Sequence, residues 1–132
     1  MQKLPKVDPH SGDPALFTGS VLVQPLKLAT DDARLSMSSV SFQVGARSAW
    51  HTHPHGQMLY VTDGIGMIQK RGEPIQIVKA GDTIWTGPNE EHWHGASADH
   101  HMTHLAIQEV DDSGNIAQWG DHVTDDEYLG HQ

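Results

Sequence analysis

Cysteine is absent from the 132-residue sequence. Its absence excludes disulfide bonds, thiolate metal sites, iron–sulfur clusters and a cysteine nucleophile. Positive charge is also scarce: lysine and arginine together number 8 against 17 acidic residues, so the net charge is −9 with neutral histidines. A chain this acidic is a poor partner for nucleic acid or for an anionic membrane surface.

Long apolar runs are missing as well. No stretch approaches the roughly 20 apolar residues of a transmembrane helix. Lys3 and Lys6 have no apolar run behind them, which is unlike a signal peptide. We therefore expect no membrane partner and a cytoplasmic location. The length suits one domain with its own hydrophobic core.

What the sequence does contain is a series of short alternating segments separated by turns rich in glycine and proline. This pattern predicts an all-β sandwich, jelly roll or barrel. Asp63-Gly64 predicts a hairpin turn, and Thr124 predicts the cap of one short C-terminal helix. Residues 1–16 lack periodicity and are predicted to form an arm, with a single domain over 17–132. The predicted strands cover residues 17–28, 35–44, 48–53, 57–62, 65–70, 74–79, 83–86, about 92–94 and 102–109.

Histidine is unusually frequent, with 11 residues. His51 and His53 form one i, i+2 pair and His92 and His94 a second, and residues at this spacing on a strand point to the same face. Gln57 offers an amide oxygen on the next predicted strand. Two or three histidines with an oxygen donor are a usual ligand set for Mn, Fe, Zn, Ni or Cu. The pattern therefore predicts a metal site. Six further histidines are predicted to lie at the surface: His10, His55, His100, His101, His122 and His131.

Two runs resemble the motifs of the cupin family. The run from Gly45 to Gly64 resembles G-x5-H-x-H-x3-4-E-x6-G, with Gln57 in place of the glutamate. The run from Gly81 to His92 resembles G-x5-P-x-G-x2-H, but Gly87-Pro88 stands where P-x-G is usual. The resemblance implies a cupin jelly-roll β-barrel with a metal inside. By motif position the implied ligands are His51, His53, Gln57 and His92.

A closer similarity covers residues 46–54, 91–96 and 102–109. These segments resemble small manganese cupins that include bacterial hydroxynitrile lyases, which also have glutamine as the fourth ligand and extra histidines corresponding to His94 and His104. The similarity implies Mn(II), with Fe(II), Zn(II) or Ni(II) as alternatives. It also implies a small-molecule substrate: a lyase would cleave or form cyanohydrins, that is, an aldehyde plus HCN, with His94 and His104 as the catalytic residues.

Other interpretations of the same residues remain open. A cupin dioxygenase or other oxidoreductase would use Fe(II) at this site, and a non-catalytic cupin would only bind a ligand. The neutral Gln57 argues against redox chemistry, because no ligand charge offsets the extra charge of an oxidised ion.

On the last predicted strand, Thr103, Leu105 and Ile107 are expected to form the core-like face, opposite His104. The N-terminal arm and an edge strand predict a homodimer or homotetramer.

Overall fold

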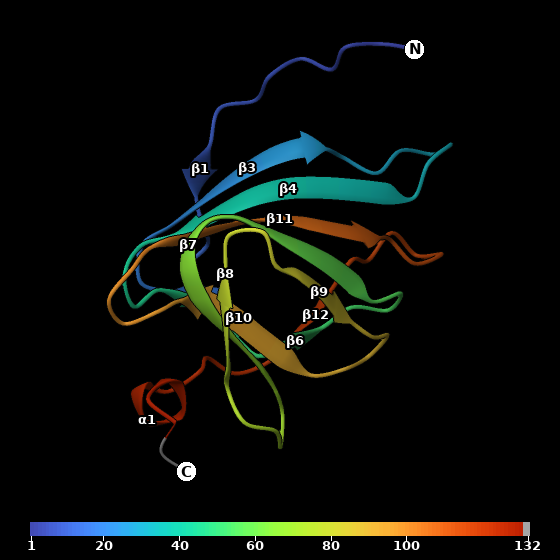
Figure 1. Ribbon diagram of the computed structural model, residues 1–132. Helices are drawn as coiled ribbons and strands as arrows, with labels where there is room; N and C mark the ends of the chain where they lie inside the picture. The colour runs from blue at the N-terminus through green and yellow to red at the C-terminus, as the bar shows by residue number, and fades with distance from the viewer. Residues whose placement is uncertain (131–132) are drawn as a thin grey trace.

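The computed structural model describes residues 1–130, which form twelve strands and one short helix (Figure 1). His131 and Gln132, the last residues of the expected domain, lie outside the described part, so the predicted surface position of His131 does as well. The elements are β1 (His10–Ser11), β2 (Phe17–Thr18), β3 (Val21–Lys27), β4 (Leu35–Phe42), β5 (Arg47–Ser48), β6 (His51–Thr52), β7 (Gln57–Lys70), β8 (Gln76–Lys79), β9 (Thr83–Thr86), β10 (His92–Ala96), β11 (Met102–Glu109), β12 (Gln118–Trp119) and α1 (Asp125–Tyr128).

All the strands belong to one antiparallel sheet that curls on itself. Its main path runs β1-β3-β4-β11-β7-β10-β5-β2, while β8 and β9 pair with β7 and β6 pairs with both β10 and β12. The first half of β7 lies in one wall beside β11 and β9, and its second half lies in the other wall beside β10 and β8. The expected all-β jelly-roll barrel with a short C-terminal helix is therefore confirmed.

The hairpin predicted at Asp63-Gly64 is wrong, because β7 continues through these residues as one long strand. No residue of β11 lies opposite Thr62 in the strand register, since Thr103 pairs with Asp63 and His104 with Val61. Gly64 has a φ of 81°, and a Cβ atom there would lie 1.9 Å from the carbonyl oxygen of His101. Thr62 is thus the extra residue of a β-bulge directly before Asp63-Gly64, where β7 passes from one wall into the other.

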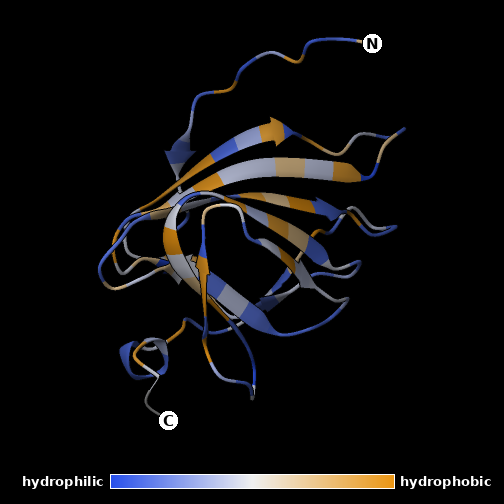
Figure 2. Ribbon diagram, viewed as in Figure 1, coloured by the Kyte–Doolittle hydropathy of each residue, from blue (hydrophilic) through white to orange (hydrophobic). Residues whose placement is uncertain are grey.

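The interior is built from alternate residues of the strands, and Figure 2 shows hydrophobic and hydrophilic residues alternating along them. On β11 the face of His104 is buried, whereas Thr103, Leu105 and Ile107 are only half-buried. The prediction that the latter three form the core-like face is therefore wrong. The barrel closes around the His104 face, and that face carries the site as well as part of the core. The main core comprises Val21, Val40, Phe42, Ala46, Val61, Val78, Ala96 and Met102.

Two predicted strands are interrupted. The strand expected over 17–28 breaks at Gly19, where φ is 84°, and the strand expected over 48–53 is divided into β5 and β6. Trp50, in the second break, is 3% exposed and packs under the C-terminal segment, whereas Trp85 on β9 is 60% exposed and so lies outside the core.

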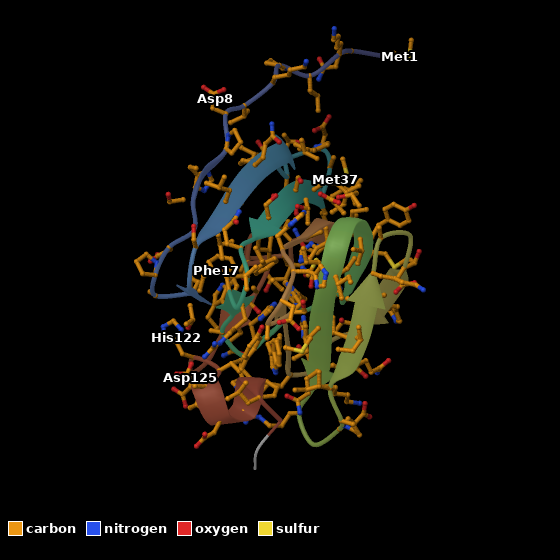
Figure 3. The ribbon with its side chains drawn as sticks, turned by 60° about the vertical axis from the view of Figure 1, so that its left-hand side comes forward. Met1, Asp8, Phe17, Met37, His122 and Asp125 are labelled. Atoms are coloured by element: carbon orange, nitrogen blue, oxygen red, sulfur yellow. The ribbon has the colours of Figure 1, made fainter. Side chains whose placement is uncertain are left out.

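The C-terminal segment is fastened to the barrel by Arg47. Its guanidinium donates to the carbonyl oxygen of Val123 and to Asp125, and it lies over the ring of Tyr128. Thr124 and Glu127 form a capping box, which confirms the predicted start of α1. Figure 3 shows Asp125 and His122 against the body, while Met1 and Asp8 lie in a segment that leads away from it. Among residues 1–130, no helix has the length and apolar character needed to cross a membrane.

Candidate metal centre

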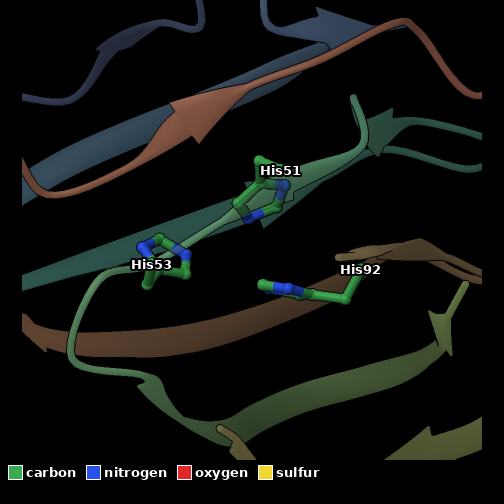
Figure 4. A group of neighbouring side chains, drawn as sticks. All are labelled: His51, His53 and His92. Carbon is green, nitrogen blue, oxygen red and sulfur yellow. The ribbon is translucent and has the colours of Figure 1, made fainter. Parts of the chain in front are cut away.

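Three histidines from two adjacent strands meet inside the barrel. His51 begins β6 and is the antiparallel partner of His92, which begins β10. His53 follows β6 directly. One nitrogen from each ring lies within 4.8 Å of the corresponding nitrogens of the other two, and Figure 4 shows the three rings around one common space. The structure therefore brings together the three histidines that the motifs singled out.

The backbone determines which nitrogen of each ring faces this space. The Nδ1 atoms lie 2.8 Å from the carbonyl oxygen of Ala49 (His51), 2.7 Å from that of Ile116 (His53) and 2.8 Å from that of Glu90 (His92). A carbonyl oxygen can only accept, so each Nδ1 carries the proton. Each Nε2 then carries no hydrogen and has a free lone pair, which is what a metal-ligating imidazole requires.

Burial keeps these three rings neutral. It lowers the pKa of His92 from 6.5 to about 4 and lowers that of His53 as well. The pKa of His51 lies well below its usual value because of burial and, secondarily, the nearby His92. Neutral imidazoles are the form that binds a cation, and at neutral pH no proton competes for the site.

Gln57, at the start of β7, completes the arrangement. Its Oε1 lies 3.4 Å from Nε2 of His92. Because the proton of His92 is on Nδ1, two lone-pair atoms face each other here without a hydrogen between them. Nε2 of His53 is buried and has no hydrogen-bond partner at all. A divalent cation would satisfy these atoms together, so the residues fit the implied metal.

His94 and His104 lie beside this group but form their own pair. Nδ1 of His94 is 2.9 Å from Nε2 of His104, and the rings are 4% and 0% exposed. Burial lowers the pKa of both, that of His104 to about 4, and His104 also lowers the pKa of His94. Nε2 of His94 and Nδ1 of His104 are left without partners. The pair therefore keeps free nitrogens available for proton transfer.

All of these groups except His92 line a cavity of about 250 Å³. The cavity lining also includes the apolar residues Phe17, Val23 and Ile116. Trp119 stacks on the ring of His51, with centroids 4.4 Å apart. A cavity lined by both imidazole nitrogens and apolar groups suits a small, partly apolar organic molecule.

Sequence reasoning missed three contributors. Ile116 contributes its carbonyl oxygen, which accepts from His53. Trp119 contributes its ring from a strand of only two residues. Neither position belongs to a sequence motif or a periodic pattern. Gln108 hydrogen-bonds to Gln57; its phase with His104 on β11 was the available indication.

By contrast, the surface positions predicted for five histidines are observed: His10, His55, His100, His101 and His122 are all exposed.

Comparison with known proteins agrees with this geometry. The cupin domain family matches residues 38–107. The chain belongs to the cupin family. It is 50% identical over 112 residues to the (R)-mandelonitrile lyase of Granulicella tundricola, covering 85% of each chain.

Solved structures show the same barrel. A cupin-like protein from Thermotoga maritima is 38% identical, with a TM-score of 0.84 and 92% of each chain covered. A cupin-2 domain from Rhodospirillum rubrum, at 18% identity, has a TM-score of 0.70 over 98% of this chain and 83% of its own. The second comparison supports the fold alone. Together with the named lyase, the family membership indicates a lyase-like cupin enzyme acting on a small molecule.

Proposed function

We propose that this cupin is a metal-dependent lyase that cleaves and forms cyanohydrins, converting an α-hydroxynitrile into an aldehyde and HCN. The observation that carries the proposal is the position of the His94–His104 pair, beside the three-histidine cluster and in the cavity that His51 and His53 also line. The named lyase at 50% identity supports the same reaction.

His51, His53, Gln57 and His92 would hold one divalent ion, Mn(II) in the first instance and Fe(II), Zn(II) or Ni(II) as alternatives. When bound, the ion supplies a Lewis acid that stabilises negative charge on the substrate oxygen. These four ligands are neutral, so they would leave the +2 charge of the ion uncompensated. This electrostatic balance favours the lyase over an oxidoreductase.

His94 takes the proton of the substrate hydroxyl at Nε2, the buried nitrogen that has no protein partner. The bond between the carbinol carbon and the nitrile carbon breaks, and its electron pair leaves with cyanide. The aldehyde remains. The pair formed by His94 and His104 then returns the proton to cyanide. The products are one aldehyde and one HCN, and the two rings are back in their starting protonation state.

The direction of this last proton transfer follows from acidity. Burial lowers the pKa of His94 and His104, so the protonated pair is a strong donor. The conjugate acid of cyanide has a pKa of about 9, so the transfer of the proton from the imidazolium to cyanide is favourable. Phe17, Val23 and Ile116, which line the cavity, hold the organic part of the substrate.

The test uses protein purified without added metal. Its metal content is measured first, and the same sample is then assayed for mandelonitrile cleavage and for oxygen consumption. Cyanide and aldehyde release in proportion to metal content is expected. Oxygen consumption without cyanide release would favour the oxidoreductase, and neither activity in a metal-loaded protein would favour a binding cupin. A homodimer or homotetramer and a cytoplasmic location stay predictions, and light scattering of the purified protein tests the first.

A further inference from the structure

The side-chain amide of Gln57 has two chemically different ends, and only its oxygen can bind a cation. The residue type alone does not decide which end faces the histidines. In the structure, Nε2 of Gln57 donates to Oε1 of Gln108 at 3.0 Å, and both side chains are buried, at 4% and 8% exposure. This bond holds the NH2 group away from the cluster and leaves Oε1 beside His92.

Gln108 is itself oriented by Ser36, its antiparallel partner on β4. Nε2 of Gln108 donates to Oγ of Ser36 at 2.7 Å, and that hydroxyl donates to the backbone oxygen of Gln108 at 3.2 Å. The single proton of Ser36 is thereby used, so its oxygen accepts from Gln108. The oxygen of the Gln108 amide is left to face Gln57.

The three side chains thus form a hydrogen-bond chain in which every side-chain amide donates in the same direction, from Gln57 to Gln108 and from Gln108 to Ser36. If Gln57 turned its amide over, its oxygen would face the oxygen of Gln108 inside the barrel. Two buried acceptors would then have no hydrogen between them, which is costly. Gln108 could relieve this only by turning as well, and Ser36 would then have to give up its bond to the backbone oxygen of Gln108.

We propose that Gln108, oriented by Ser36, is a positioning residue that selects the amide oxygen of Gln57 as the fourth ligand of the metal centre. Gln108 does not bind the ion itself, because its oxygen is used by Gln57. The inference rests on the proposed metal centre and not on the lyase reaction.

The test is a double-mutant cycle with metal affinity as the readout. Metal-free protein is titrated with Mn²⁺ by calorimetry for the wild type, Gln108→Leu, Gln57→Ala and the double variant. Loss of a group that orients a ligand typically costs about 10–100-fold in metal affinity. We expect that loss for Gln108→Leu in the wild-type background and less than about a twofold change in the Gln57→Ala background, where no amide remains to orient.

The controls separate orientation from general damage to the barrel. Gln43→Leu, at an exposed position, should leave the affinity unchanged, and thermal unfolding should show each variant folded. If Gln108→Leu does not fold, Ser36→Ala replaces it in the cycle, with a loss in the same direction.

Two results would overturn the inference. One is unchanged affinity in Gln108→Leu, and the other is an equal loss with and without Gln57. Failure of the wild type to bind Mn²⁺, Zn²⁺ or Fe²⁺ would overturn the metal centre and the inference with it. Tight metal binding without cyanohydrin cleavage would refute only the proposed reaction.

Discussion

His94 and His104 are joined by a hydrogen bond 2.9 Å long between Nδ1 of the first ring and Nε2 of the second. One proton occupies this bond, so the two rings act on protons as a unit. The arrangement also shows why His94 is suited to a role different from that of His92, two residues earlier. His94 lies outside the group of three converging rings and bonds its Nδ1 to another imidazole, whereas His92 belongs to that group and bonds its Nδ1 to a backbone oxygen.

The first prediction concerns this pair. His94→Ala should keep its metal and its fold and lose turnover by about 10²–10⁴-fold, the usual contribution of a general base. His104→Ala should cost less, because water can protonate cyanide in its place. Metal content and turnover are measured on the same samples. Full metal with unchanged turnover in His94→Ala would leave the ion as the sole catalyst, and lost metal would make His94 a ligand.

The second prediction concerns metal retention. His92→Ala removes one of three converging nitrogens and should lose most of the metal, as measured by elemental analysis after dialysis. The matched control is His100→Ala, an exposed histidine outside the cluster, which should retain the wild-type amount. A full equivalent of metal in His92→Ala would show that the ligand assignment is wrong.

The third prediction concerns the neutral amide. Gln57→Glu should keep the metal but lower the charge of the site from +2 to +1, so that azide or cyanide binds more weakly. The change in binding free energy is expected to be on the order of a few kcal/mol for charges separated by a few ångströms at a partly buried site. Anion titration followed by paramagnetic resonance of the manganese form measures it. Equal anion affinity in the wild type and in Gln57→Glu would show that the charge of the fourth ligand does not control anion binding.

The fourth prediction concerns the pH dependence of stability in metal-free protein. The folded-state pKa values of His92 and His104 are about 4, below the ordinary value of 6.5. Between these values the unfolded chain binds more protons than the folded one. The free energy of unfolding should therefore fall as the pH falls from about 6.5 to 4, by up to about 1.4 kcal/mol per pH unit for each such histidine.

Urea unfolding of chelator-treated protein at several pH values checks this prediction. The matched variant is His104→Phe, which removes one titrating ring from the interior and should make the pH dependence shallower. A free energy of unfolding that does not change across this range would contradict the neutral, buried state of these rings.

The sequence by itself determined the fold class and the placement of His51 and His53 on one face of a strand. Alternating segments predict strands because side chains alternate between the faces of a strand, and the i, i+2 spacing places His51 and His53 on one face for the same reason. The capping box of Thr124 and Glu127 is equally local. Each of these features depends on residues close together in the chain, so its pattern is visible without the fold.

The tertiary structure decided what depends on distant parts of the chain meeting. Whether Asp63-Gly64 forms a turn or follows a bulge in a continuous strand depends on His101, whose carbonyl oxygen comes so close to Gly64 that no side chain fits. The proton position on His53 depends on Ile116, and the direction of the Gln57 amide depends on Gln108 and Ser36. These partners act through backbone oxygens and hydrogen-bond direction, which leave no periodic pattern in the sequence and arise only when the barrel closes.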